Sequence, residues 1–141
     1  MKYATLLCLA SILAVCFTAC SLFSQPEDEL SQQERLLVGP TWKLVAIFDT
    51  YDELWHEDDG TGSESIFEFY KDKRFMQDEV GGCCKQVGIW RFAEDERELT
   101  LRYTDGSNRD LSYEVRELSA GELELAWLGR HGPVIERYRP K

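Results

Sequence analysis

From Thr41 to the end of the chain, apolar and polar residues alternate with a period of two in short runs. Such alternation is typical of strands that are buried on one face and solvated on the other. Turn-forming residues such as Asp105-Gly106 and Ala120-Gly121 separate the runs. The pattern predicts about eight strands. Seven of them cover 42–48, 66–70, 87–93, 99–103, 111–115, 123–127 and 134–139, and the third strand along the chain begins at Phe75.

The spacing of these strands leaves no room for crossover helices. Every link except Asp49–Glu64 is short enough to join neighbouring strands. We therefore predict an all-β, up-and-down antiparallel barrel with its apolar side inside, and an open sandwich is the alternative. The interior of such a small barrel is either filled by side chains or holds one small ligand.

A short helix is predicted ahead of the first strand. Ser31-Gln32-Gln33-Glu34 is a capping box, and Leu30, Leu36 and Leu37 share one helical face. The helix should end before Gly39-Pro40. Residues 20–35 then form a tether and the start of this helix, and residues 36–141 form one barrel domain.

The amino terminus predicts export. Residues 1–19 carry Lys2 as their only charge, followed by an apolar run that is too short to span a bilayer comfortably. Phe17-Thr18-Ala19-Cys20 resembles the lipobox of bacterial lipoproteins, although that motif prefers Leu or Val where Phe17 stands. The resemblance implies a lipid on Cys20 and a stable membrane anchor in the bacterial cell envelope. An ordinary secretory signal cut after Ala19 is the alternative.

The chain is acidic, with a formal net charge of -10. This charge argues against nucleic acid as a partner and against adhesion to anionic lipid head groups. A specific protein partner is neither indicated nor excluded by the charge.

Four segments resemble the lipocalin-like domains of bacterial lipoproteins: "LLVGPTWKLVAI", "IFEFYKDKRF", "GIWRFAEDERELTLRY" and "YEVRELSAGELEL". Pro40 adds a residue before the Trp, and Lys73 stands where Gly is common. In that family the Trp plugs one end of the barrel and an Arg of the last strand packs across it. The resemblance assigns these roles to Trp42 and Arg139, with Arg137 as the second candidate and an exposed Arg as the plain alternative.

Aromatic residues alternate along the predicted strands and are either core or the lining of a ligand cavity. The candidates for ligand lining are Phe48, Phe67, Phe69, Trp90, Tyr103, Tyr113 and Trp127.

No motif for catalysis, metal binding or a cofactor is present, so we expect no enzyme activity, no metal and no cofactor. His56 and His131 are predicted in separate loops. The segment from His56 to Glu64 is acidic and could wrap a calcium ion, but it lacks the ligand spacing of a known calcium loop. A solvated connection is favoured, and a lid at one mouth of the barrel is conceivable.

Cys83 and Cys84 follow Gly81-Gly82, which predicts a hairpin tip outside the core. A vicinal disulfide, two free thiols and a link to a partner all remain open, and a strained vicinal bond would be easily reduced.

Two functions fit these observations. In the first, the anchored barrel binds a small apolar ligand. In the second, the barrel is filled and its outer surface acts as an envelope accessory or inhibitor protein. The fold alone does not choose between them.

Overall fold

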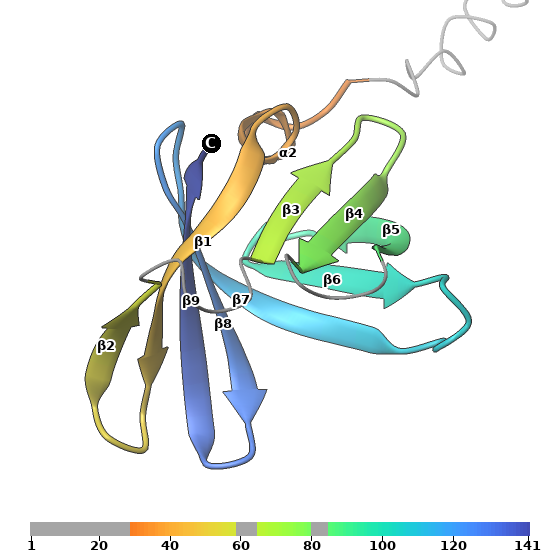
Figure 1. The fold of residues 1–141 in the computed structure, drawn as a ribbon. Coiled ribbons are helices and arrows are strands. Elements are labelled where there is room, and N and C mark those ends of the chain that lie inside the picture. Colours follow the sequence, from red (N-terminus) through yellow and green to blue (C-terminus); the bar gives the residue numbers. More distant parts are fainter. Residues whose placement is uncertain (1–28, 59–64, 80–84) are drawn as a thin grey trace, which may run out of the picture.

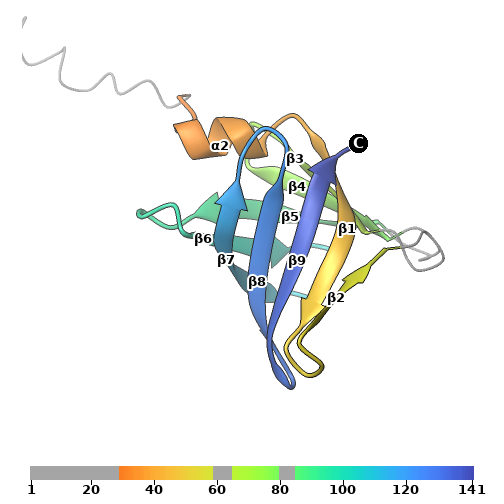
Figure 2. The same cartoon turned by 90° about the vertical axis from the view of Figure 1, so that its left-hand side faces the viewer.

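The computed structural model describes residues 29–58, 65–79 and 85–141. These residues form one short helix and a single antiparallel sheet that closes on itself (Figures 1 and 2). The elements are α2 (Gln32–Leu37), β1 (Thr41–Asp49), β2 (Leu54–Glu57), β3 (Ser65–Phe69), β4 (Arg74–Glu79), β5 (Gln86–Phe92), β6 (Glu98–Tyr103), β7 (Asp110–Leu118), β8 (Leu123–Gly129) and β9 (Gly132–Pro140).

The barrel wall consists of β1 and β3 to β9. Each of β3 to β8 pairs with the next strand along the chain, and β1 pairs with both β3 and β9. The closing ladder runs from the pair Trp42–Pro140 to the pair Asp49–Val134. This arrangement confirms the predicted up-and-down barrel, and the alternative of an open sandwich is wrong.

Strand β2 was not predicted. It folds back on the second half of β1, where Trp55 lies opposite Phe48. Strand β3 pairs with only the first three residues of β1, from Thr41 to Lys43. All four residues of β2 are exposed. The long link of the sequence therefore contains a short strand outside the barrel wall, which Figure 1 shows beside β1.

Helix α2 begins as its capping box predicts. The Ser31 hydroxyl accepts a hydrogen bond from the backbone N–H of Glu34, and the Glu34 side chain accepts one from the backbone N–H of Ser31. The helix ends at Leu37, and Gly39 follows with a φ of 114° that few other residues adopt. Figure 2 shows α2 lying across one end of the barrel.

One close contact inside the barrel depends on a glycine. A Cβ at Gly88 would lie 2.1 Å from the backbone oxygen of Arg102 and 2.5 Å from Cε1 of Phe75. Phe75 is fully buried, so its ring lies where a side chain at position 88 would stand. The absence of a side chain at Gly88 thus leaves room for the Phe75 ring of β4 to pack against β5 and β6.

A β-bulge in β1 reverses which residues face inward. Leu44 lies opposite Tyr138 and Ala46 lies opposite Arg137, so Val45 is an extra residue. After the bulge Ile47 packs against the core, whereas Phe48 stacks on Trp55 with ring centroids 5.5 Å apart. The prediction that Phe48 lines the barrel interior is therefore wrong. A strict period of two cannot hold across the inserted residue.

Candidate functional site

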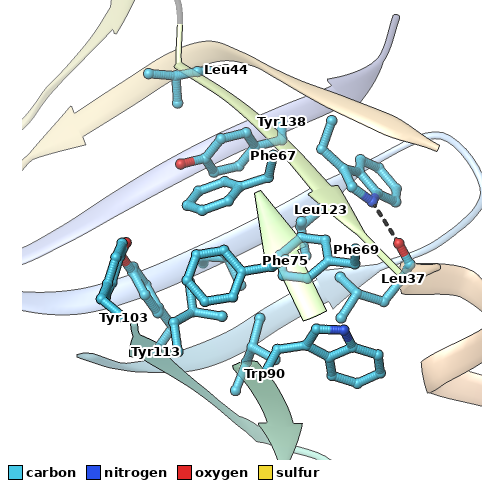
Figure 3. Packing of buried hydrophobic residues seen from close by; sticks show 14 residues of the cluster. Leu37, Leu44, Phe67, Phe69, Phe75, Trp90, Tyr103, Tyr113, Leu123 and Tyr138 are labelled. Carbon is cyan, nitrogen blue, oxygen red and sulfur yellow. Dashed lines mark hydrogen bonds between the residues drawn. The ribbon is translucent and has the colours of Figure 1, made fainter. Parts of the chain in front are cut away.

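The inward side chains divide into an apolar half and a polar half. The apolar half lies under α2, and its members are almost fully buried. They include Leu37, Trp42, Phe67, Phe69, Trp90, Leu99, Leu101 and Leu123. Figure 3 shows Leu37 and Trp90 at one end of this cluster and Tyr103 and Tyr113 at the other.

Trp42 closes the apolar end together with the helix. It is fully buried, and its Nε1 donates a hydrogen bond of 2.9 Å to the backbone oxygen of Leu37 (Figure 3). Leu37 is the last residue of α2, so its carbonyl has no partner within the helix. The indole therefore both fills the barrel end and satisfies a helix terminus.

Lys73, in the turn between β3 and β4, links helix α2 to strand β5. Its ammonium group pairs with the Glu34 carboxylate of the capping box and lies 4.3 Å from the centre of the Trp90 ring. Lys73 has a φ of 66°, the left-handed conformation that Gly adopts most easily. A Lys at position 73 is therefore less favourable for the backbone than a Gly would be. The ion pair with Glu34 and the cation–π contact with Trp90 offset this cost.

Three of the predicted lining residues belong to the packed core. Phe67 and Phe69 stack with ring centroids 5.6 Å apart, and the Trp90 ring meets Phe69 edge-on at 6.1 Å. All three are at most 2% exposed. Their rings fill the closed half of the barrel instead of facing open space.

The polar half of the interior carries groups that form hydrogen bonds with one another. Glu136 accepts hydrogen bonds from Trp127 Nε1 at 3.0 Å and from the Tyr138 hydroxyl at 2.7 Å. The Tyr103 hydroxyl donates to Gln77 Oε1 at 2.6 Å. We call Glu136, Tyr138, Trp127, Tyr103 and Tyr113 the mouth cluster.

The sheet register places the mouth cluster on one inner surface. Glu136 lies opposite Leu125 of β8 and Ile47 of β1, which both face inward. Trp127 lies two residues beyond Leu125, so it faces the same way nearer the end of β8. It is 37% exposed, whereas Tyr103 and Tyr113 are buried. Trp127 therefore stands where the interior meets solvent.

Burial shifts the pKa values of this cluster. Desolvation raises the pKa of Glu136, although the hydrogen bonds from Tyr138 and Trp127 act in the opposite direction. Desolvation also raises the pKa of Tyr103 to about 12 and the pKa values of Tyr113 and Tyr138 further, and the charge of Glu136 adds to each. The three tyrosines therefore keep their protons at neutral pH.

Arg109 packs against one member of this cluster, Tyr103. Its guanidinium lies 4.2 Å from the centre of the Tyr103 ring, and it donates a hydrogen bond of 2.7 Å to Gln86 Oε1. It is exposed, in the turn ahead of β7. Arg109 thus covers one side of Tyr103 and makes no ion pair with Glu136.

Arg139 does not pack across Trp42. It lies opposite Lys43 on β1, one residue away from Trp42 and therefore on the outer face, and it pairs with Glu122 at 3.5 Å. The second candidate, Arg137, also faces outward, where its guanidinium lies 4.1 Å from the centre of the Trp55 ring. The predicted contact is wrong, because Pro140 is the residue of β9 that lies opposite Trp42.

Both histidines lie away from the mouth cluster. His56 belongs to β2 and not to a loop, and it bonds to Asp52 at 2.8 Å. His131 packs beside the Tyr51 ring in the turn between β8 and β9. Within residues 29–58, 65–79 and 85–141, no group of three or more acidic, His or Cys side chains is placed to hold a metal ion.

Several predicted features lie outside the described residues. They are the signal segment, the lipid site Cys20, most of the acidic connection before β3, and the pair Cys83 and Cys84. The assignments made for them remain predictions. A search of the described part of the chain for a membrane-spanning helix found none of sufficient length and hydropathy.

The outer face of the barrel has a groove and an apolar patch. The groove has a volume of about 480 Å³ and crosses β7 and β8. Its lining includes Glu114, Arg116, Ala126, Leu128 and Pro133, together with Tyr113 and Trp127 of the mouth cluster. The patch lies on β4, β5 and the turn before β4, and its most exposed apolar side chains are Tyr70, Val87 and Ile89. Neither surface was predicted from the sequence.

The comparisons with known proteins establish the fold. No protein-family model and no curated protein matches the chain. The structure matches the crystal structure of a lipocalin-like protein from Bacteroides uniformis ATCC 8492 with a TM-score of 0.58 and 17% sequence identity. The match covers 75% of this chain and 99% of the other chain. The protein therefore has a lipocalin-like fold, as its sequence motifs predicted.

Proposed function

We propose that this protein binds a small, largely apolar ligand at the mouth cluster of its barrel while a lipid on Cys20 holds it at a membrane of the bacterial cell envelope. The mouth cluster supports this proposal most directly. Its carboxylate, hydroxyl and indole N–H groups converge on one inner surface beside a packed apolar half, and a few convergent polar groups among apolar side chains are typical of ligand sites.

The apolar and polar halves of the interior would contact different parts of the ligand. The closed half is packed, so a ligand would contact its upper surface, where Phe67 and Phe75 approach Tyr138 and Tyr103 with centroid distances of 5.5 Å and 5.1 Å. Trp127 is the exposed member of the mouth cluster and would cover the bound molecule. Apolar contact would supply affinity, and the hydrogen-bonding groups would set orientation.

A direct test is native mass spectrometry of the protein purified from envelopes of the cells that produce it. A co-purifying small molecule that is absent from a Trp127→Ala variant is the expected result. Leu128→Ala is the matched control, because Leu128 is the next residue and is 81% exposed. Identical spectra for the protein and the Trp127 variant, with no bound molecule in either, would contradict binding at the mouth.

The anchor is tested separately. Replacement of Cys20 by Ala should release the protein from the membrane fraction and stop incorporation of labelled fatty acid. The motivation is the position of Ala19-Cys20 directly after the apolar run. Unchanged labelling would refute lipidation at Cys20.

A second candidate function is action through the outer surface, as an envelope accessory or inhibitor protein. The groove over Ala126 and the exposed apolar patch favour it, because grouped exposed apolar side chains often mark contact sites. In this case Leu128→Glu in the groove should abolish a cross-link to an envelope protein, while Glu136→Gln inside the barrel should leave it intact.

A further inference from the structure

Glu136 is a half-buried carboxylate that has no cationic partner among the described residues. Its two contacts in the described chain are the hydrogen bonds from Trp127 and Tyr138, both neutral groups. Glu124, a half-buried acid on the neighbouring strand β8, instead pairs with Arg137 at 2.6 Å. The segments 59–64 and 80–84 contain no Lys or Arg that could supply the missing charge.

An uncompensated carboxylate in this position is costly. Charged groups that leave water are normally paired, and a lone one is among the most destabilising features of a protein interior. Two neutral donors satisfy part of the hydrogen-bonding capacity of the carboxylate and leave further lone pairs available. Glu136 can therefore accept further hydrogen bonds or a cation in addition to its two neutral donors.

The rings around Glu136 suit a positive charge. Trp127 and Tyr138 bond to the carboxylate, and Tyr103 and Tyr113 are close enough for its charge to raise their pKa values. Aromatic faces attract cations, and a carboxylate among aromatic rings is a common environment for an ammonium group. The acidic chain, with a net charge of -10, would also concentrate cations around it.

We propose that the ligand carries a positively charged head group, an ammonium or a guanidinium, that pairs with Glu136 inside the mouth cluster while its apolar part lies against the closed half. This proposal rests on the proposed ligand-binding function. An anionic head group would have to use Arg109, which is already held by Tyr103 and Gln86 and lies at the exposed turn.

The test compares three probes with the same ten-carbon chain: decylamine, decanol and decanoate. Binding to the full mature protein is measured by isothermal titration calorimetry at neutral pH, below the concentrations at which the probes aggregate. We expect decylamine to bind at least about tenfold more tightly than decanol, as a charge-assisted contact would provide. The Glu136→Gln variant should lose this preference and still bind decanol.

Glu114→Gln is the control, because Glu114 is exposed on the outer face of β7 and its replacement changes the net charge equally. It should keep the preference for decylamine. Circular dichroism and a urea midpoint show whether each variant is folded, and the conservative replacement Glu136→Asp gives a second variant that retains the charge.

The possible results separate the two proposals. Equal binding of all three probes, tighter binding of decanoate, or a preference for decylamine that survives in Glu136→Gln would overturn the cationic head group and leave the ligand-binding function standing. Failure of all three probes to bind the folded protein would contradict both. A preference that disappears only in Glu136→Gln supports the inference.

Discussion

The most informative single perturbation of this fold is at Trp42. Its indole is fully buried between the barrel end and α2, and its Nε1 donates to the Leu37 carbonyl at 2.9 Å. Two replacements separate these contributions. Trp42→Ala removes the whole ring, whereas Trp42→Phe keeps an aromatic ring and removes the N–H.

The expected magnitudes follow from what each variant leaves behind. Trp42→Ala creates a cavity under the helix, and large-to-small replacements of this type cost about 3 to 5 kcal/mol. Trp42→Phe leaves the Leu37 carbonyl buried without a partner, which costs about 1 to 3 kcal/mol. The free energy of unfolding should therefore fall in the order wild type, Phe variant, Ala variant.

Urea denaturation followed by circular dichroism measures these differences from the midpoint and slope of each transition. Leu128→Ala serves as the control, because an exposed side chain outside a specific contact should change stability by about 0.5 kcal/mol or less. A loss below about 1 kcal/mol for Trp42→Ala would refute the assignment of Trp42 to barrel closure.

Three further predictions concern other contacts. Gly88→Ala should cost about 1 to 3 kcal/mol in urea denaturation because the new methyl group meets the Arg102 backbone and Phe75, and an unchanged midpoint would contradict this packing. Lys73→Gly should be more stable than Lys73→Ala by about 0.5 to 1 kcal/mol, since both lose the pair with Glu34 but only Gly relieves the positive φ; equal midpoints would contradict that strain. Burial raises the pKa of Glu136 above 4.5, so the native state holds its proton more tightly than the unfolded state. The stability that this group contributes is therefore lost as pH rises from 4.5 through the native pKa. Over that pH range the free energy of unfolding of Glu136→Gln should rise relative to that of the wild type. Parallel profiles of unfolding free energy against pH for the two proteins would contradict the shift.

Much of the fold could be predicted because alternation and turn chemistry are local signals. The eight wall strands and the capping box of α2 both follow from residue order alone. Strand β2 gave no comparable signal: its four residues are all exposed, so its sequence, Leu54 to Glu57, lacks a buried face.

The errors at the candidate site have identifiable physical causes. Ala46, Ile47 and Phe48 are all apolar, so the sequence fits either phase of alternation and does not reveal the bulge at Val45. Glu136 was missed because a charged residue in an alternating strand is normally assigned to solvent. Only the register that sets it beside Ile47 and Leu125 places it inside the barrel.

The ladder between β1 and β9 also determines when this protein can fold. The pair Trp42–Pro140 joins residues from opposite ends of the domain, so the barrel wall stays open until the last strand has been synthesised. Until then β1 and β8 each expose an unpaired edge, and such edges recruit strands from other molecules. Domains dominated by such distant pairings fold in about milliseconds to seconds. Loss of β9 would therefore turn the protein into an aggregating sheet and not into a smaller barrel.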